Sequence, residues 1–142
     1  MRSRIFFITY VAANLSLVAY AVLTLINPAI LVDSFLQRVY ALPPEATTAV
    51  DYLAALFRLL GFFNLILGSL GLLLLRQYGL GRQRWIVHVV IASSLLAYLG
   101  PIVFDNTVGH IGVFEIIELA LFIAMILSGI LMLAGREQAR VA

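Results

Sequence analysis

The chain contains neither cysteine nor lysine, and only 11% of its 142 residues are charged. The lack of cysteine excludes disulfides, thiolate metal sites and redox catalysis by thiols. Soluble domains typically carry about 25% charged residues, so the low charge content excludes an ordinary soluble globule. The net charge of +2 is too small to predict a nucleic-acid partner.

What the chain has instead is apolar sequence, with 63% hydrophobic residues and a mean hydropathy of +1.09. Four apolar runs each approach the roughly 20 residues that a helix needs to cross about 30 Å of hydrocarbon. They cover residues 5–26, 53–75, 85–104 and 113–134. The sequence therefore predicts an all-α membrane protein, a four-transmembrane-helix bundle in which residues 1–142 form a single domain within the lipid bilayer.

The arginines are distributed unevenly among the segments between these runs. The termini and the loop between the second and third runs hold seven arginines, whereas the two other loops hold only Arg38. Cytoplasmic segments of membrane proteins carry an excess of basic residues. We therefore predict a multi-pass protein of a bacterial-type inner membrane with both termini cytoplasmic. The seven arginines are Arg2, Arg4, Arg76, Arg82, Arg84, Arg136 and Arg140.

The segment after the first run contains a second, shorter apolar pattern. The first run ends at Asn27-Pro28, because proline cannot continue the hydrogen bonding of a helix. Pro28 can open a new helix in which four apolar residues share one side. The four residues are Leu31, Phe35, Leu36 and Val39. This pattern predicts a short amphipathic helix in the outer loop, acting either as a lid over the bundle or as a plain connector.

The stretch Asp51–Leu75 carries a small, polar face on a helix that is otherwise leucine, isoleucine and phenylalanine. At about 100° per residue, six residues fall on that face. They are Ala54, Arg58, Gly61, Asn64, Gly68 and Gly71. Lipid chains cannot hydrogen-bond a guanidinium or a carboxamide, and glycines allow close approach of a neighbouring helix. We therefore expect this stretch to be the inner helix of the bundle.

Depth in the membrane predicts two pairs of polar residues. At 1.5 Å per residue, Arg58 and Glu118 both lie about 9–10 Å below the outer surface, with Glu115 about one turn shallower. An unpaired charge at such a depth costs roughly 2.5–3.5 kcal/mol, so an ion pair between the second and fourth helices is expected. Asn14 and Asn64 both lie near the midplane, where they can bond each other.

These polar groups allow two interpretations. In the first, they are structural and fix the register of the helices. In the second, they form a pocket in which Arg58 holds an anion or a carbonyl, and Glu115 or Glu118 exchanges protons. Nothing in the sequence marks a nucleophile, a substrate or a metal site. We therefore predict no catalytic residue and no metal ligand, and the sequence favours a protein that is not an enzyme.

His88 lies about one turn from the basic loop Arg76–Arg84. A histidine in a membrane helix can ligate haem or chlorophyll, but a second intramembrane histidine for a bis-histidine haem is missing. Hydrogen bonding at the membrane interface is the alternative. No cofactor is predicted from the residues beyond a bound lipid, quinone or pigment.

The run LFRLLGFFNLILGSLGLL resembles the Arg-x-x-Gly helix of small bacterial four-helix membrane proteins of the DoxX-like kind. The resemblance covers about 20 residues around Arg58 and Gly61. In that family such a helix typically opens the domain, whereas here it is the second of four. Members are often accessory subunits or proteins of unknown activity, and the resemblance implies the same for this chain.

Two functions follow from these observations. The first is a non-catalytic accessory subunit or small integral component of a larger membrane protein complex, whose partners are other subunits or further copies of itself. The alternative is a small carrier or binder of an amphiphile, a quinone or a lipid, in a pocket around Arg58, Glu115 and Glu118.

Overall fold

The computed structural model of the chain describes residues 2–32, 47–81, 83–108 and 113–141. Within these ranges the chain is helical and contains no strand. Its long helices are α1 (Arg2–Ile26), α3 (Thr47–Gly81), α4 (Arg84–Val108) and α5 (Val113–Val141). Each of the four is long and apolar enough to cross a membrane. The predicted all-helical class with four apolar helices is confirmed.

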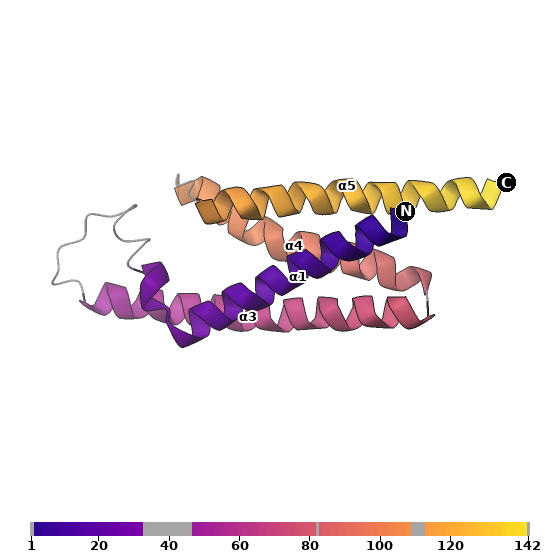
Figure 1. The fold of residues 1–142 in the computed structure, drawn as a ribbon. Helices are drawn as coiled ribbons and strands as arrows, with labels where there is room; N and C mark the ends of the chain where they lie inside the picture. The colour runs from indigo at the N-terminus through magenta and orange to yellow at the C-terminus, as the bar shows by residue number, and fades with distance from the viewer. Residues whose placement is uncertain (1, 33–46, 82, 109–112, 142) are drawn as a thin grey trace.

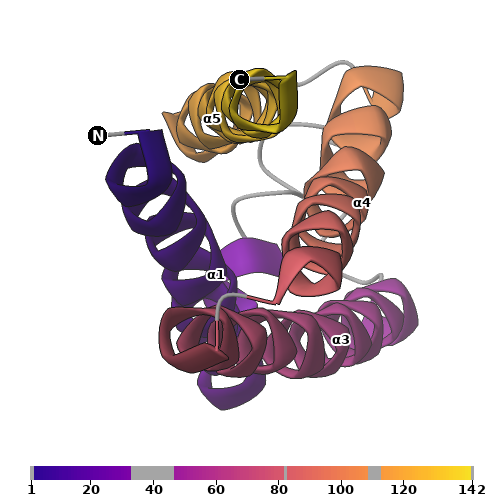
Figure 2. The same cartoon turned by 90° about the vertical axis from the view of Figure 1, so that its right-hand side faces the viewer.

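Consecutive helices run in opposite directions, so that the two termini and the turn between α3 and α4 lie at one end of the molecule (Figure 1). We call this end the basic end, because the exposed residues Arg4, Arg76 and Arg84 lie near the ends of α1, α3 and α4 that meet there. Viewed from this end, the four helices surround a common interior (Figure 2). In that arrangement α3 and α5 lie on opposite sides and are not packing neighbours.

The central element of the bundle is α1, which packs against α3, α4 and α5. The expectation that the Asp51–Leu75 helix occupies this place is wrong, because α3 packs substantially only against α1 and α4. The difference lies in the width of the buried surfaces. Buried residues of α3 form one narrow stripe, whereas those of α1 cover a broad arc. The buried residues of α1 are Phe6, Tyr10, Ala13, Asn14, Leu17, Ala21 and Thr24.

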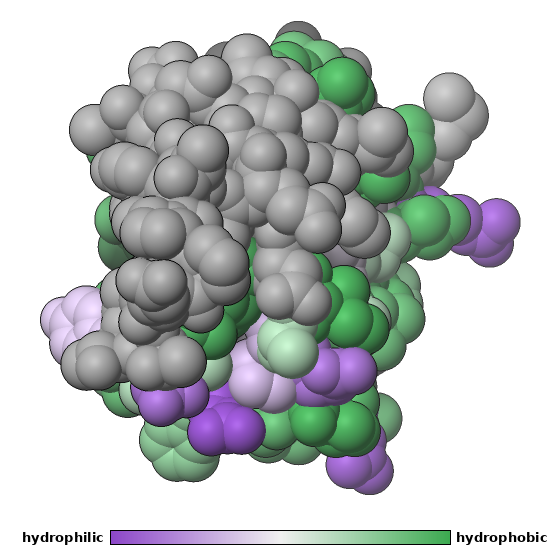
Figure 3. All heavy atoms as spheres, turned by 90° about the vertical axis from the view of Figure 1, so that its left-hand side faces the viewer, coloured by the Kyte–Doolittle hydropathy of each residue, from purple (hydrophilic) through white to green (hydrophobic). Residues whose placement is uncertain are grey.

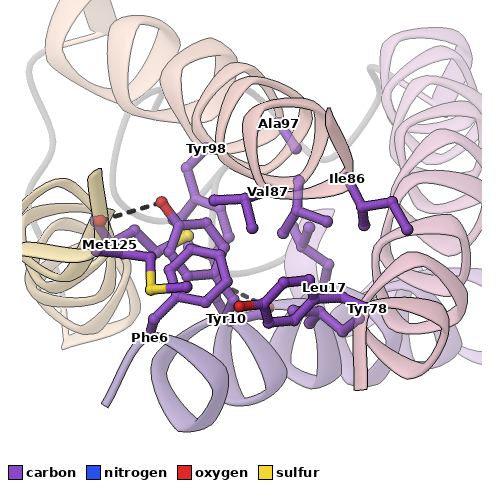
Figure 4. Close-up of a cluster of buried hydrophobic side chains, with 13 residues drawn as sticks. Phe6, Tyr10, Leu17, Tyr78, Ile86, Val87, Ala97, Tyr98 and Met125 are labelled. Atoms are coloured by element: carbon purple, nitrogen blue, oxygen red, sulfur yellow. Dashed lines mark hydrogen bonds between the residues drawn. The ribbon is translucent and has the colours of Figure 1, made fainter. Parts of the chain in front are cut away.

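Aromatic side chains join α1 to α3 near the basic end. The rings of Phe6 and Tyr10 are tilted against each other with centroids 4.5 Å apart. Phe6 also meets Tyr78 of α3 edge-on at 6.3 Å. These rings lie beside Leu17, Val87 and other apolar side chains in the core (Figure 4). Edge-on and offset arrangements are favourable because the positive edge of one ring meets the negative face of another.

The small face predicted on residues 51–75 lies against α1 over most of its length. A Cβ on Gly61 would overlap the hydroxyl of Thr24, and one on Gly68 would come within 2.9 Å of the Asn14 carbonyl oxygen. A Cβ on Gly71 would overlap the Asn14 carboxamide. The three glycines therefore set the close approach of the two helices.

The helices extend beyond the predicted spans. At 35 residues, α3 is about 52 Å long, well over the roughly 30 Å of a hydrocarbon layer. Most of the basic loop expected at Arg76–Arg84 is helical instead, because α3 continues as far as Gly81. A glycine inside a helix costs only about 1 kcal/mol relative to alanine. Contact between Tyr78 and Phe6 anchors this last part of α3 on α1.

The predicted end of the first helix is confirmed. Its last turn is closed by the Asn27 amide, which donates to the Leu23 carbonyl at 2.9 Å. The amides of Leu31 and Val32 then donate to the Pro28 carbonyl at 3.1 and 3.0 Å, so a new helical turn begins there. The remainder of the predicted amphipathic helix, including Phe35, Leu36 and Val39, lies outside the described residues.

The glycine contacts give a first prediction. Gly71→Ala should lower the free energy of unfolding by about 1–3 kcal/mol, because its methyl group would collide with the buried Asn14 side chain. Gly79→Ala is the matched control: nothing lies within 4 Å of a Cβ there, so it should stabilise the helix by roughly 0.5–1 kcal/mol. Thermal unfolding in detergent measures both. Equal melting temperatures for the two variants would contradict the close α1–α3 packing.

Candidate functional site

Two buried tyrosines connect helices through their hydroxyl groups. The Tyr98 hydroxyl of α4 donates to the Ala13 carbonyl of α1 at 2.8 Å. The Tyr10 hydroxyl of α1 donates to the Met125 carbonyl of α5 at 3.0 Å (Figure 4). A phenolic hydroxyl without an acceptor in an apolar interior costs free energy. These two bonds therefore fix α4 and α5 against α1.

Asn14 lies where α1, α3 and α4 meet and is almost fully buried, at 1% exposed. Its Nδ2 donates to the Tyr10 carbonyl at 2.7 Å and to the Ser94 hydroxyl of α4 at 3.1 Å. The position that a Cβ of Gly71 would occupy lies against its Oδ1, so a Cα hydrogen of this glycine points at that oxygen. Cα–H···O contacts of this kind recur where helices pack closely. Asn14 thus holds three helices at one level.

The other buried hydroxyls bond mostly within their own helix. Ser128 donates to the Met125 carbonyl at 3.2 Å, and Thr24 donates to the Ala21 carbonyl at 2.9 Å. The Met125 carbonyl therefore accepts from both Ser128 and Tyr10. Gly129 leaves room for this, since a Cβ there would lie 3.1 Å from the Tyr10 hydroxyl.

Asn64 is also buried, at 6% exposed, but it does not pair with Asn14 as predicted. Among the residues that the structure describes, the Asn64 side chain has no hydrogen-bond partner. The physical reason is a difference in level. Asn14 lies opposite Gly68 and Gly71, one to two turns closer to the basic end than Asn64. The carboxamide of Asn14 is instead bonded to Tyr10 and Ser94.

Arg58 and the two glutamates are not brought together. The Arg58 side chain is exposed on α3, whereas Glu115 and Glu118 are half-buried on α5, which is not a packing neighbour of α3. In the part of the chain that the structure describes, Arg58 makes no ion pair. Glu118 lies near the Tyr98 side chain of α4. Equal depth was not sufficient to predict contact, because it leaves the order of helices around the bundle undetermined.

The predicted haem or pigment ligand, His88, is exposed on α4 one turn after Arg84. A group bound there would lie on the outside of the bundle near the basic end. Among the described residues, no group of three or more histidines, cysteines and carboxylates is placed to hold a metal ion.

The basic end also carries an exposed tryptophan and a cleft. The Trp85 ring is exposed at the start of α4, and its Nε1 donates to Gln83 Oε1 at 2.8 Å. The cleft has a volume of about 230 Å³ and lies between the start of α1 and the end of α3. Its lining residues are Ser3, Arg4, Phe7, Ile8, Tyr78 and Gly79. We call it the α1–α3 cleft; neither it nor the tyrosine bonds were predicted from the sequence.

At the opposite end of the molecule, hydrophilic side chains gather in the lower part of the view, in the region where α1 ends and α3 begins (Figure 3). Apolar side chains are visible beside them (Figure 3). Along α3, Arg58 and Arg76 are 18 positions apart, which corresponds to about 27 Å of helix rise. This distance is close to the thickness of a hydrocarbon layer, about 30 Å.

The chain matches no protein-family model, no curated protein and no solved structure.

The second prediction is that the two buried asparagines, Asn14 and Asn64, differ in their contribution to stability. Asn14→Leu should lower the free energy of unfolding by about 1–3 kcal/mol, because it removes two hydrogen bonds and crowds Gly71. Asn64→Leu should leave stability unchanged or raise it, because a buried carboxamide that has no hydrogen-bond partner among the described residues is replaced by an apolar group of similar size. Thermal unfolding of both variants in the same detergent measures the difference. A loss of stability in Asn64→Leu as large as that in Asn14→Leu would refute it.

Proposed function

We propose that this chain is an integral membrane protein of a bacterial-type inner membrane, with both termini in the cytoplasm, and that it serves as a non-catalytic accessory subunit of a larger membrane protein complex. The observation that carries the proposal is the apolar exterior of the bundle. Large apolar side chains are exposed on every long helix, for example Ile8, Phe63, Leu96 and Leu127.

An exposed apolar surface on all sides requires a surrounding that is itself apolar. On a soluble protein, contiguous exposed apolar patches beyond a few hundred Å² mark contacts with a partner or a membrane. Here such side chains follow four helices, each with a stretch long enough to cross a bilayer. Lipid together with membrane-embedded protein surfaces fits this exterior, and a cytosolic partner does not.

The positions of the arginines support a specific placement in the bilayer. Arg58 and Arg76 bound a stretch of about 27 Å on α3, which matches the hydrocarbon thickness. Both side chains then reach the headgroups, which explains how Arg58 is tolerated on an exposed helix face. By the positive-inside rule the basic end faces the cytoplasm.

The accessory role is supported by the buried polar side chains, which form their hydrogen bonds within the bundle. Tyr10, Asn14 and Tyr98 bond other atoms of the bundle, so they hold its helices together. Contacts with other proteins are then made by the helix faces inside the membrane, where association depends on close packing. The resemblance of the Arg58–Gly61 stretch to DoxX-like proteins, whose members are often accessory subunits, agrees with this role.

The alternative, an amphiphile carrier with its pocket around Arg58, Glu115 and Glu118, needs these three side chains to face one space. They lie on helices that are not packing neighbours, and Arg58 is exposed.

Site-specific crosslinking in native membranes tests the accessory role. A photoreactive residue placed at Ile8, Phe63, Leu96 or Leu127 samples the outer face of one helix each, and the same residue at the fully buried Val90 is the control. We expect at least one outer position to form a single protein adduct in high yield while the others mostly capture lipid. Lipid adducts alone at all four positions, with the chain migrating as an isolated protein, would refute the proposal.

The orientation is tested on a single helix. Tyr52 and Leu80 are both exposed and lie near opposite ends of α3. Because the chain has no cysteine, Tyr52→Cys and Leu80→Cys each introduce one unique thiol. In intact cells an impermeant maleimide should label Tyr52→Cys only, and Leu80→Cys should react after the membrane is permeabilised. The reverse pattern would place the basic end outside.

A further inference from the structure

The α1–α3 cleft at the basic end joins a polar part to an apolar part. On α1 it is lined by Ser3 and Arg4 and, one turn further along, by Phe7 and Ile8. On α3 it is lined by Tyr78 and Gly79, and nothing lies within 4 Å of where a Cβ of this glycine would be. The lack of a side chain at Gly79 therefore keeps that wall of the cleft open.

The polar part of the cleft is suited to an anion. Among the described residues, Arg4 makes no ion pair, and its guanidinium can donate two parallel hydrogen bonds to a phosphate group. The Ser3 hydroxyl is a second donor. Both residues lie in the first turn of α1, where the unbonded amides and the helix dipole also favour negative charge.

The apolar part leads away from the anion site along α1. Phe7 and Ile8 are both exposed, and they belong to the stretch of α1 that is apolar enough to cross a membrane. A molecule that fills the cleft thus meets a cation and hydroxyl at one end and an apolar helix face at the other. A free phosphate ion would use only the first part, whereas a phospholipid matches both.

The charge at this end selects among phospholipids. Arg4, Arg76 and Arg84 are all exposed there, and none of them makes an ion pair with another described residue. Their combined positive potential attracts anionic headgroups over zwitterionic ones. The neighbouring Trp85 has an amphipathic ring of the kind that settles at headgroup level.

We infer that the α1–α3 cleft is a binding site for one anionic phospholipid, whose phosphate lies on Arg4 and Ser3 and whose acyl chain follows Phe7 and Ile8. The site holds whether or not the chain has a protein partner, so the inference does not depend on the accessory role.

Native mass spectrometry of the purified full chain tests this inference with two probes, phosphatidylglycerol and phosphatidylcholine carrying the same acyl chains. We expect one molecule of phosphatidylglycerol to be retained in preference to phosphatidylcholine. Gly79→Trp fills the cleft and should abolish this retention; Leu80→Trp, an adjacent and 75% exposed position that does not line the cleft, is its control. Arg4→Gln should weaken retention about fivefold, as expected for one arginine near a headgroup.

Arg84→Gln distinguishes the cleft from a diffuse basic surface, because it removes the same charge at the same end without touching the cleft. It should weaken retention less than Arg4→Gln does. The inference fails if Arg84→Gln and Arg4→Gln have equal effects, if Gly79→Trp retains as much lipid as Leu80→Trp, or if both lipids bind equally. Displacement by millimolar inorganic phosphate with no dependence on the acyl chain would identify a free-phosphate site instead.

Discussion

The structure depends on one constraint: a polar atom left without a hydrogen-bond partner inside an apolar bundle costs free energy. Tyr10, Asn14 and Tyr98 meet this constraint by bonding to atoms of other turns or other helices. The geometry of those bonds fixes which helices are neighbours, because a hydroxyl reaches only about 3 Å. Between apolar helices in lipid there is little hydrophobic force to choose a partner, so a few such bonds have a large influence on the arrangement.

Close packing by glycine acts together with these bonds. Gly68 and Gly71 bring α3 against Asn14, and that short approach leaves the asparagine almost no exposure. The asparagine in turn reaches Ser94 of α4, so the α1–α3 contact and the α1–α4 contact share one residue. A bulkier residue at Gly71 would therefore disturb α4 as well as α3. This coupling explains how a thin bundle with few polar atoms maintains one arrangement.

Much of the fold could be predicted from the sequence, because it depends on local properties. Hydropathy identified four helices, proline marked the end of α1, and periodicity placed Gly61, Asn64, Gly68 and Gly71 on one buried face. The site could not be predicted in the same way. Equal depth on two helices predicts a pair of Arg58 and Glu118, but contact also needs the helices to be neighbours, which depends on bonds such as that from Tyr98 to Ala13. A tyrosine inside an apolar run was the signal available, since its hydroxyl must be given an acceptor.

The length of α3 changes the meaning of its charges. A helix of about 52 Å cannot be contained in a hydrocarbon layer of about 30 Å without a strong tilt or projecting ends. If the outer boundary of the hydrocarbon layer lies at the end of the apolar run, Arg58 lies inside the membrane and needs a buried partner. If the hydrocarbon layer instead spans the stretch of α3 between Arg58 and Arg76, Arg58 lies at its boundary and needs only headgroups or water. The exposure of Arg58 on a helix that is not a neighbour of α5 agrees with the second placement. The same placement leaves Asn64 about 9 Å inside the boundary, buried against α1, where its carboxamide has to be shielded from lipid by the bundle itself.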